Sequence, residues 1–299
     1  MIRFIVSWRI AVAIGLGAGT AGAGEPAPRW QRDNVQAWCI VPFDAKKRSS
    51  EERAEMLQAI GLRRYAYDYR PEHIATFDRE IEVMKQRGIE ITAWWFPQKV
   101  DDTAKLIFAA IKRHAIKPAL WISGGGPPAK TPEEQTARVA AEAARIRPIA
   151  EVARSLGCPI ALYNHGGWFG DPENQLAVIE ALRRDGIADV GLVYNFHHAH
   201  EHVRMFATLW PRISARVVAV NLSGVVENGD RTDRKIMYLG EGDQELAMLR
   251  IIRASGWRGQ VGILCHRTDV DAESALRRNL AGYDELIAQI EAQPAARKK

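Results

Sequence analysis

Short apolar runs alternate with longer amphipathic stretches along most of the chain. Eight of these runs, bounded mostly by Gly or Pro, predict β-strands at residues 37–42, 63–69, 89–96, 116–123, 159–165, 188–196, 216–223 and 260–266. Their hydrophobicity is nearly continuous rather than strictly alternating, which is typical of parallel strands covered on both faces. The pattern therefore favours an α/β protein with a buried parallel sheet.

Eight amphipathic stretches follow these runs and predict helices at residues 49–60, 76–88, 101–114, 131–157, 173–186, 201–210, 243–256 and 273–293. Strands and helices that alternate eight times predict a single (β/α)8 barrel over residues 35–292, a fold that typically needs about 250 residues. An open doubly wound sheet would carry a Gly-rich nucleotide loop after its first strand, but residues 41–50 (VPFDAKKRSS) contain no glycine.

The beginning of the chain predicts an export signal in residues 1–23. Arg3 and Arg9 precede and border an apolar run over residues 10–23, which ends in small residues, Ala21-Gly22-Ala23. We expect cleavage after Ala23 and a periplasmic or extracellular address; an uncleaved N-terminal anchor is the alternative. Residues 24–34 would form an N-terminal extension and residues 293–299 a frayed basic tail. No other stretch approaches the roughly 18 apolar residues of a membrane helix, so no stable membrane span is expected after cleavage.

Composition adds little to this picture except by exclusion. The 299 residues are 47% hydrophobic and 26% charged, which excludes a disordered or collagen-like chain. The formal net charge is +5, and it falls to +3 once Arg3 and Arg9 are removed with the signal. That charge is too small to predict nucleic-acid binding. Cys39, Cys158 and Cys265 all lie in apolar runs and are expected to be core cysteines.

Polar and aromatic side chains gather at the ends of the predicted strands. In a (β/α)8 barrel, the C-terminal strand ends and the loops after them form the active site. The residues at these ends include Asp68, Arg70, Trp95, Trp121, Tyr163, Asn164, His165, Trp168, Asn195, His197, His198, His200, Asn221, Ser223 and His266. Six of the eight histidines lie at or just after the strand ends, all but His114 and His202. We expect these side chains to converge on one mouth.

The chemistry of this mouth predicts a neutral, polyhydroxylated ligand. Flat aromatic rings pack against the C–H faces of sugars, while amide and guanidinium groups bind hydroxyls. The predicted substrate-binding residues are Asn164, Asn195, Asn221, Trp95, Trp121, Trp168, Arg70 and His200. A packed barrel core is the alternative role of the aromatic residues, because alternate residues of each strand point toward the helices.

Four segments carry a resemblance to a known family. They are LYNHGG (162–167), GLVYNFHHAH (191–200), VAVNLSG (218–224) and LGEGDQELAMLRIIRASGWRGQVGI (239–263). Together they resemble the xylose-isomerase-like TIM-barrel family, which contains sugar isomerases, ketose 3-epimerases, inosose dehydratases and abasic-site endonucleases. The resemblance spans roughly residues 35–290. It implies sugar chemistry on a (β/α)8 barrel, with His198 in the place of the family's substrate-binding histidine.

The resemblance also implies a divalent metal, but the chain departs from the family at the ligands. The family's Glu, Asp and His on strands five, six and seven fall on Tyr163, Asn195 and Asn221, and its last Glu falls near Cys265. None of the four offers the carboxylate or imidazole that the family uses. The cofactor therefore stays open. A late transition metal held by imidazoles is the alternative to a metal-free site, with His165, His198, His200 and His266 as its candidate ligands.

For acid–base work the sequence offers His198 and Asp68, with His165 and Tyr163 in support. Moving a proton beside a sugar carbonyl needs a base and a group that stabilises the enediolate oxygen. For Asp68, an ion pair with Arg70 is the structural alternative.

We predict an exported sugar isomerase or epimerase that acts on a neutral carbohydrate. A lyase or hydratase of 3-keto sugars or glycosides is one alternative, and a non-catalytic carbohydrate-binding barrel is another. Nucleic acid is not an expected partner, because the metal-binding residues of the family's endonucleases are absent.

Overall fold

Eight parallel strands close into a barrel in the order in which they occur along the chain. We describe residues 30–292 from a computed structural model; the predicted export signal, residues 24–29 and the tail 293–299 lie outside the described residues. The strands are β1 (Val35–Trp38), β2 (Arg64–Tyr67), β3 (Glu90–Phe96), β4 (Ala119–Ile122), β5 (Ile160–Tyr163), β6 (Val190–Asn195), β7 (Val217–Leu222) and β8 (Gln260–Leu264). The predicted single (β/α)8 barrel is confirmed.

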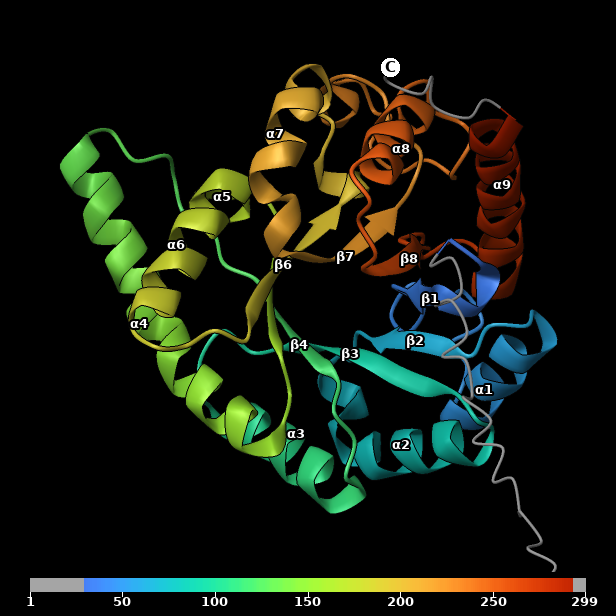
Figure 1. Ribbon diagram of the computed structural model, residues 1–299. Coiled ribbons are helices and arrows are strands. Elements are labelled where there is room, and N and C mark those ends of the chain that lie inside the picture. The colour runs from blue at the N-terminus through green and yellow to red at the C-terminus, as the bar shows by residue number, and fades with distance from the viewer. Residues whose placement is uncertain (1–29, 293–299) are drawn as a thin grey trace, which may run out of the picture.

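Helices surround the barrel on its outside (Figure 1). They are α1 (Ser50–Ala59), α2 (Phe77–Gln86), α3 (Asp102–His114), α4 (Pro132–Leu156), α5 (Gly167–Gly170), α6 (Pro172–Arg184), α7 (Phe206–Ile213), α8 (Glu245–Ala254) and α9 (Ala272–Ala292). Ser49 and Thr131 cap α1 and α4, since their side chains accept hydrogen bonds from the backbone N–H groups of Glu52 and Glu134. The sequence did not predict α5, a single turn after β5.

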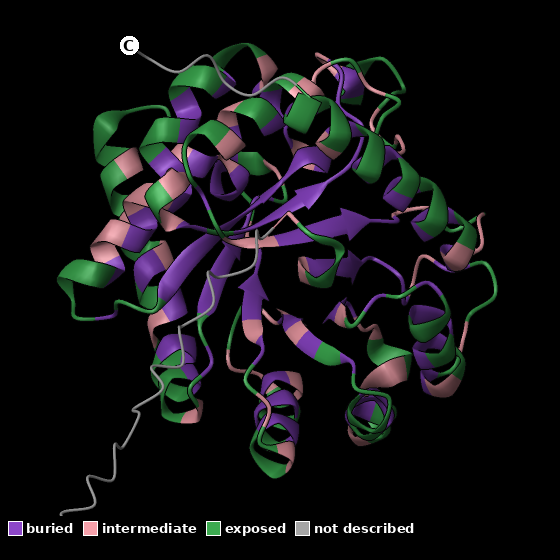
Figure 2. Ribbon diagram, turned by 45° about the vertical axis from the view of Figure 1, so that its right-hand side comes forward, coloured by how far each residue is buried: buried purple, intermediate pink, exposed green. Residues whose placement is uncertain are grey.

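Each strand divides its side chains between two apolar layers. The outer layer packs the strands against the helices and contains Tyr65, Tyr67, Trp94 and Tyr194. A smaller inner layer fills the barrel and contains Trp38, Ala66, Ala93, Trp95, Trp121, Tyr163, Val193 and Leu264. Burial on both sides explains the nearly continuous apolar runs of the sequence. Figure 2 shows the same arrangement, with buried strands inside and exposed surface on the outer faces of the helices.

Most predicted strands are longer than the observed ones, and the first is displaced. The sequence predicts it at residues 37–42, but β1 ends at Trp38. Cys39, the next residue, has a φ of 56°, in the left-handed region that residues other than glycine seldom adopt. This turn ends the strand, so Trp38 is the last residue of β1, and it belongs to the inner layer.

Part of the predicted N-terminal extension packs against the barrel. Trp30 lies 6.1 Å from the Trp257 ring, and its carbonyl accepts a hydrogen bond from the Tyr283 hydroxyl at 2.6 Å. All three cysteines are buried and unpaired, as expected of core cysteines. Over residues 30–292, none of the helices has the length and apolarity needed to cross a bilayer.

Candidate active site

A cavity of about 60 Å3 opens at the C-terminal end of the barrel. It is lined by residues at the ends of six strands and in the loops that follow them: Trp38, Cys39, Phe43, Asp68, Arg70, Trp95, Tyr163, His165, His197, His198 and His266. The four predicted catalytic residues, Asp68, Tyr163, His165 and His198, all lie on this lining. Strands β1, β2, β3, β5, β6 and β8 therefore deliver an acid, a phenol and neutral rings to one place.

Asp68 is the one carboxylate on this lining. It follows β2 and is buried, and its Oδ1 accepts a hydrogen bond from the Val41 N–H at 3.3 Å. Its Oδ2 is buried and has no hydrogen-bond partner within residues 30–292. Burial raises the pKa of Asp68 to about 7, although Arg70 opposes this change. A carboxyl group with this pKa exchanges its proton readily at neutral pH.

Arg70 does not form the ion pair that was the structural alternative for Asp68. Its Nη1 donates to the backbone carbonyls of Asp68 and Tyr69, at 2.9 and 2.8 Å. Its guanidinium also lies 5.7 Å from the centre of the Phe43 ring. The cation thus stays near Asp68 without neutralising it directly.

Four histidine rings form a continuous row along the other wall of the cavity. The ring centres of His165 and His198 are 4.8 Å apart, those of His198 and His197 are 4.7 Å apart, and those of His197 and His266 are 4.6 Å apart. Burial, followed by the neighbouring imidazoles, lowers the pKa of His198 to about 2, and burial likewise lowers that of His197 to about 3. These rings are neutral at physiological pH, so each has one N–H donor and one nitrogen acceptor.

Tyr163 lies at the floor of the cavity, with its ring among three tryptophans. Its hydroxyl oxygen accepts hydrogen bonds from Trp38 Nε1, at 2.9 Å, and from Asn195 Nδ2. The Trp95, Trp121 and Trp38 ring centres lie 5.1, 5.6 and 5.8 Å from that of Tyr163. Burial raises the pKa of Tyr163 well above its ordinary value. The phenol is therefore protonated and tightly held.

Several predicted substrate-binding residues do not line this cavity. The Asn164 side chain donates to the Asn195 carbonyl and accepts from the Asn195 backbone N–H. The Asn195 side chain donates to the Tyr163 hydroxyl oxygen, and its Oδ1 accepts from the His197 N–H at 2.9 Å. The Asn221 side chain is buried inside the barrel. Its Oδ1 packs so closely against Gly262 that any side chain at that position would collide with it. The amide groups of Asn164 and Asn195 are thus committed to holding the strand ends together.

The remaining predicted residues split between the cavity and the packing around it. Trp95 and Arg70 reach the cavity, whereas Trp121 packs beneath Trp38 with ring centres 4.7 Å apart. Trp168 belongs to α5, outside the barrel, and donates to Gln135 Oε1 at 2.6 Å. Both ring nitrogens of His200 face backbone carbonyls, those of Val226 and Lys235. His200 therefore has no ring nitrogen free for a ligand or a metal.

The sequence analysis missed Trp38, Cys39 and Phe43, which lie at the end of β1 and in the loop after it. Phe43 stacks on His266 with ring centres 4.0 Å apart. The signal that could have found them was the first strand itself. The predicted strand continued to residue 42, so its C-terminal end was placed four residues beyond Trp38, where β1 in fact ends.

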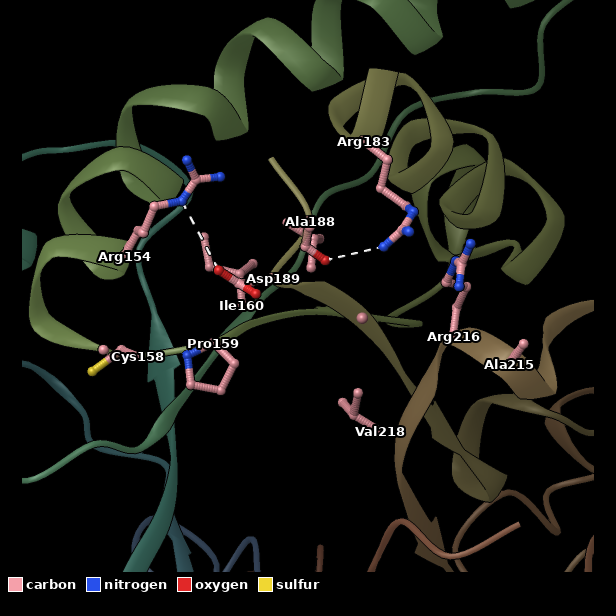
Figure 3. A pocket seen from close by; sticks show the side chains of 13 residues that line it. Arg154, Cys158, Pro159, Ile160, Arg183, Ala188, Asp189, Ala215, Arg216 and Val218 are labelled. Carbon is pink, nitrogen blue, oxygen red and sulfur yellow. Dashed lines mark hydrogen bonds and ion pairs between the residues drawn. The ribbon is translucent and has the colours of Figure 1, made fainter. Parts of the chain in front are cut away.

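A second cavity, of about 510 Å3, lies at the opposite end of the barrel, near the first residues of β5, β6 and β7. Figure 3 shows Arg154, Arg183 and Arg216 around it. Each of these guanidinium groups has a structural partner: Arg154 donates to the Gly186 carbonyl at 2.7 Å, Arg183 to the Ala188 carbonyl at 3.3 Å, and Arg216 to Glu180 at 2.8 Å. This end of a barrel serves stability, and we place the chemistry at the other end.

The divalent metal that the family resemblance implies does not fit the residues present. Tyr163, Asn195 and Asn221 take the ligand positions on β5, β6 and β7, and all three are neutral. Tyr163 would have to lose a proton that burial holds firmly, while Asn195 uses both of its amide atoms in hydrogen bonds. Among residues 30–292, no three His, Cys, Asp or Glu side chains are arranged so that they could hold a metal ion. The site offers no anionic cage for a hard cation.

Comparison with known families matches residues 59–286 to the family described as xylose isomerase-like TIM barrel. No curated protein sequence matches significantly. Among solved structures, L-ribulose 3-epimerase is similar, with a TM-score of 0.63 and 14% identity over 89% of this chain and 99% of that one. The apo form of 3-keto-D-glucoside 4-epimerase, YcjR, from E. coli has a TM-score of 0.60 and 13% identity, over 85% and 99%. IOLI protein with a bound zinc atom has a TM-score of 0.61 and 16% identity, over 85% and 98%.

Proposed function

The chain belongs to the xylose isomerase-like TIM-barrel family, and on that premise we propose that it is a sugar isomerase or epimerase, which moves a proton beside the carbonyl group of a neutral carbohydrate. The observation that carries this proposal is Asp68: a buried carboxyl group, with an unpartnered oxygen among the described residues, on the wall of the cavity at the catalytic end of the barrel. The names of the fold neighbours, several of them sugar epimerases, support the same chemistry.

In the proposed reaction, Asp68 acts as the proton-transferring base. The ionised carboxylate removes a proton from the carbon next to the carbonyl group, the C–H electron pair forms a C=C bond, and the carbonyl π pair moves to oxygen. Return of this proton by Asp68 to the former carbonyl carbon gives an isomer, as the hydroxyl proton of the first carbon moves to the enediolate oxygen. For an epimer, the first carbon takes a proton from solvent on the opposite face, and Asp68 releases the proton that it removed to solvent. A base whose pKa lies near 7 suits both removal and return.

The neutral histidines would orient the sugar rather than carry charge. His165 and His198 lie side by side in the cavity wall, and each offers one donor and one acceptor to adjacent hydroxyls. Trp95 supplies a flat apolar surface beside them. Because the cavity lining contains only one carboxylate and one guanidinium, a neutral sugar fits it better than a highly charged one.

The test is solvent-deuterium exchange with the protein from Gly24 to Lys299, purified without a His tag. The probes are D-allulose, D-tagatose, D-fructose, L-ribulose and a 3-keto-D-glucoside, with NMR for deuterium and chromatography for products. Deuterium on the carbon next to the carbonyl, together with an epimer or isomer, supports the proposal. Loss of a substituent without an epimer would favour the lyase, and calorimetric binding without exchange would favour the non-catalytic barrel; either result overturns it.

We also propose export, which the basic start and the small residues at 21–23 of the sequence support. N-terminal sequencing of protein from the native host tests it, and a mature chain that begins at Gly24 is expected. Intact Met1 in a soluble cytoplasmic fraction would reject this address.

A further inference from the structure

The hydrogen bonds around Tyr163 leave its hydroxyl group with only one role. A phenol can donate one hydrogen bond and accept through its oxygen. Here Trp38 Nε1 and Asn195 Nδ2 both donate to that oxygen, and each is an N–H group that can only donate. The hydroxyl group must therefore give its own proton to something else. The Asn221 side chain lies beside this hydroxyl group and acts to lower the pKa of Tyr163, although neither of its amide atoms has a partner at hydrogen-bond geometry within the described part of the chain.

The geometry around Tyr163 is fixed before any ligand arrives. Trp38 packs edge-on against Trp121, with ring centres 4.7 Å apart, and Trp95 packs edge-on against Tyr163 at 5.1 Å. Asn195 is itself held by the backbone N–H of His197 and by Asn164. Donors held in place within an apolar surrounding stabilise developing charge far better than mobile donors in water.

We propose that the Tyr163 hydroxyl group, oriented by Trp38 and Asn195, donates the hydrogen bond that stabilises the negative charge on the substrate's carbonyl oxygen, in the role that a divalent cation would otherwise fill. This inference rests on the proposed function, and it concerns how the charge is carried rather than which proton moves. When Asp68 removes the proton, the carbonyl oxygen becomes an enediolate oxygen. Tyr163 keeps its proton and shares it with this oxygen. Tyr163 is thus the catalytic donor, and Trp38 and Asn195 are positioning residues.

The same geometry explains why the three inward residues on β5, β6 and β7 are neutral. A cation at this place would repel the N–H groups of Trp38 and Asn195, which point toward the Tyr163 oxygen. The side chains of Asn195, Asn221 and Trp38 therefore suit a phenol donor better than a metal ion.

The experiment compares deuterium exchange into the ketoses named above for wild type, Tyr163→Phe, Trp38→Phe and Tyr194→Phe. Tyr194→Phe is the matched control, because it removes a buried hydroxyl group that faces the helices and bonds to His202. We expect Tyr163→Phe to lower kcat by about 100- to 1000-fold with little change in KM, as for loss of one oxyanion donor. Trp38→Phe should show a smaller loss of kcat, and the control none. Wild-type exchange should survive EDTA, with no stoichiometric metal by elemental analysis.

Three outcomes would overturn the inference. Exchange that EDTA abolishes and Mn2+ restores would return the charge to a metal. A folded Tyr163→Phe variant with a kcat within about threefold of wild type would remove the donor role while leaving the proposed function intact. Wild-type protein that exchanges none of the probes would refute the proposed function and this role together. If Tyr163→Phe fails to fold in thermal unfolding, Trp38→Phe and the chelation result decide.

Discussion

Replacing Asp68 by Asn should lower the free energy of unfolding at acidic pH and raise it at alkaline pH. Burial raises the pKa of Asp68 to about 7 in the folded protein, against 3.8 for the unperturbed group. Because the folded pKa is raised, the native state binds more protons than the unfolded state between about pH 4 and pH 7. The stability of wild type must therefore fall as the pH rises through this window, and stay low above it.

The size of the effect follows from the same values. The difference between about 7 and 3.8, at about 1.4 kcal/mol per pH unit, corresponds to about 4 kcal/mol. Asparagine escapes this cost, since it has no charge, and its Oδ1 can still accept from the Val41 N–H. However, its NH2 group would take the place of the unpartnered Oδ2, which costs roughly 1–2 kcal/mol. Asp68→Asn should thus be less stable than wild type by roughly 1–2 kcal/mol at pH 4, and more stable by roughly 2–3 kcal/mol at pH 8.

The assay is urea unfolding of both proteins, followed by tryptophan fluorescence, at half-unit steps from pH 4 to pH 9. Asp189→Asn, at an exposed carboxylate, is the control and should follow wild type across the range. Turnover of Asp68→Asn should be lost at every pH, so the variant would be more stable and less active at pH 8. A stability difference that does not vary with pH, or one that favours the variant at pH 4, would refute the raised pKa.

Three further perturbations test other parts of the structure. His198→Ala should lower turnover by about 100-fold or more while the barrel stays folded. His202→Ala, outside the cavity, is the control. If His198→Ala turned over substrate as fast as wild type, His198 would have only a packing role. Glu80→Gln should lower the free energy of unfolding by about 3–5 kcal/mol in urea, because it leaves buried Arg53, now bonded to Glu80 at 3.1 Å, without a counter-charge; a loss below about 1 kcal/mol would contradict this. Asn195→Asp should create measurable Mn2+ binding in calorimetry, since a carboxylate brings charge to the β6 position; no gain over wild type would count against that position as a metal site.

The periodicity of apolar and polar residues was sufficient to predict the architecture. A parallel strand buried on both faces and a helix buried on one face leave different patterns in the sequence, and those patterns depend only on neighbouring residues. The alternation of eight such pairs, with no glycine in residues 41–50, therefore indicated a closed barrel before any contact was known. The rule that chemistry lies at C-terminal strand ends then brought Asp68, Tyr163, His165 and His198 onto the candidate list.

The details of the site depended on distances that no local pattern contains. The left-handed turn at Cys39 shortened β1, and only then did Trp38 become the inward residue that meets Tyr163 from across the barrel. The four histidines that the sequence offered as metal ligands likewise separate in space. His165, His198 and His266 reach the cavity, but His200 turns to the carbonyls of the loop after β7.

What the sequence determined by itself was the fold and the strand ends at which chemistry would gather, because both follow from the burial pattern of single strands and helices. Which polar groups are free to act was decided only by the tertiary structure. Asn164 and Asn195 look like ligands for a sugar in the sequence, yet they are used in holding β5 to β6, while Asp68 keeps one buried oxygen without a partner among the described residues. A hydrogen bond needs a donor and an acceptor in contact, and here the two come from different strands around the barrel, so no local sequence pattern shows the pairing.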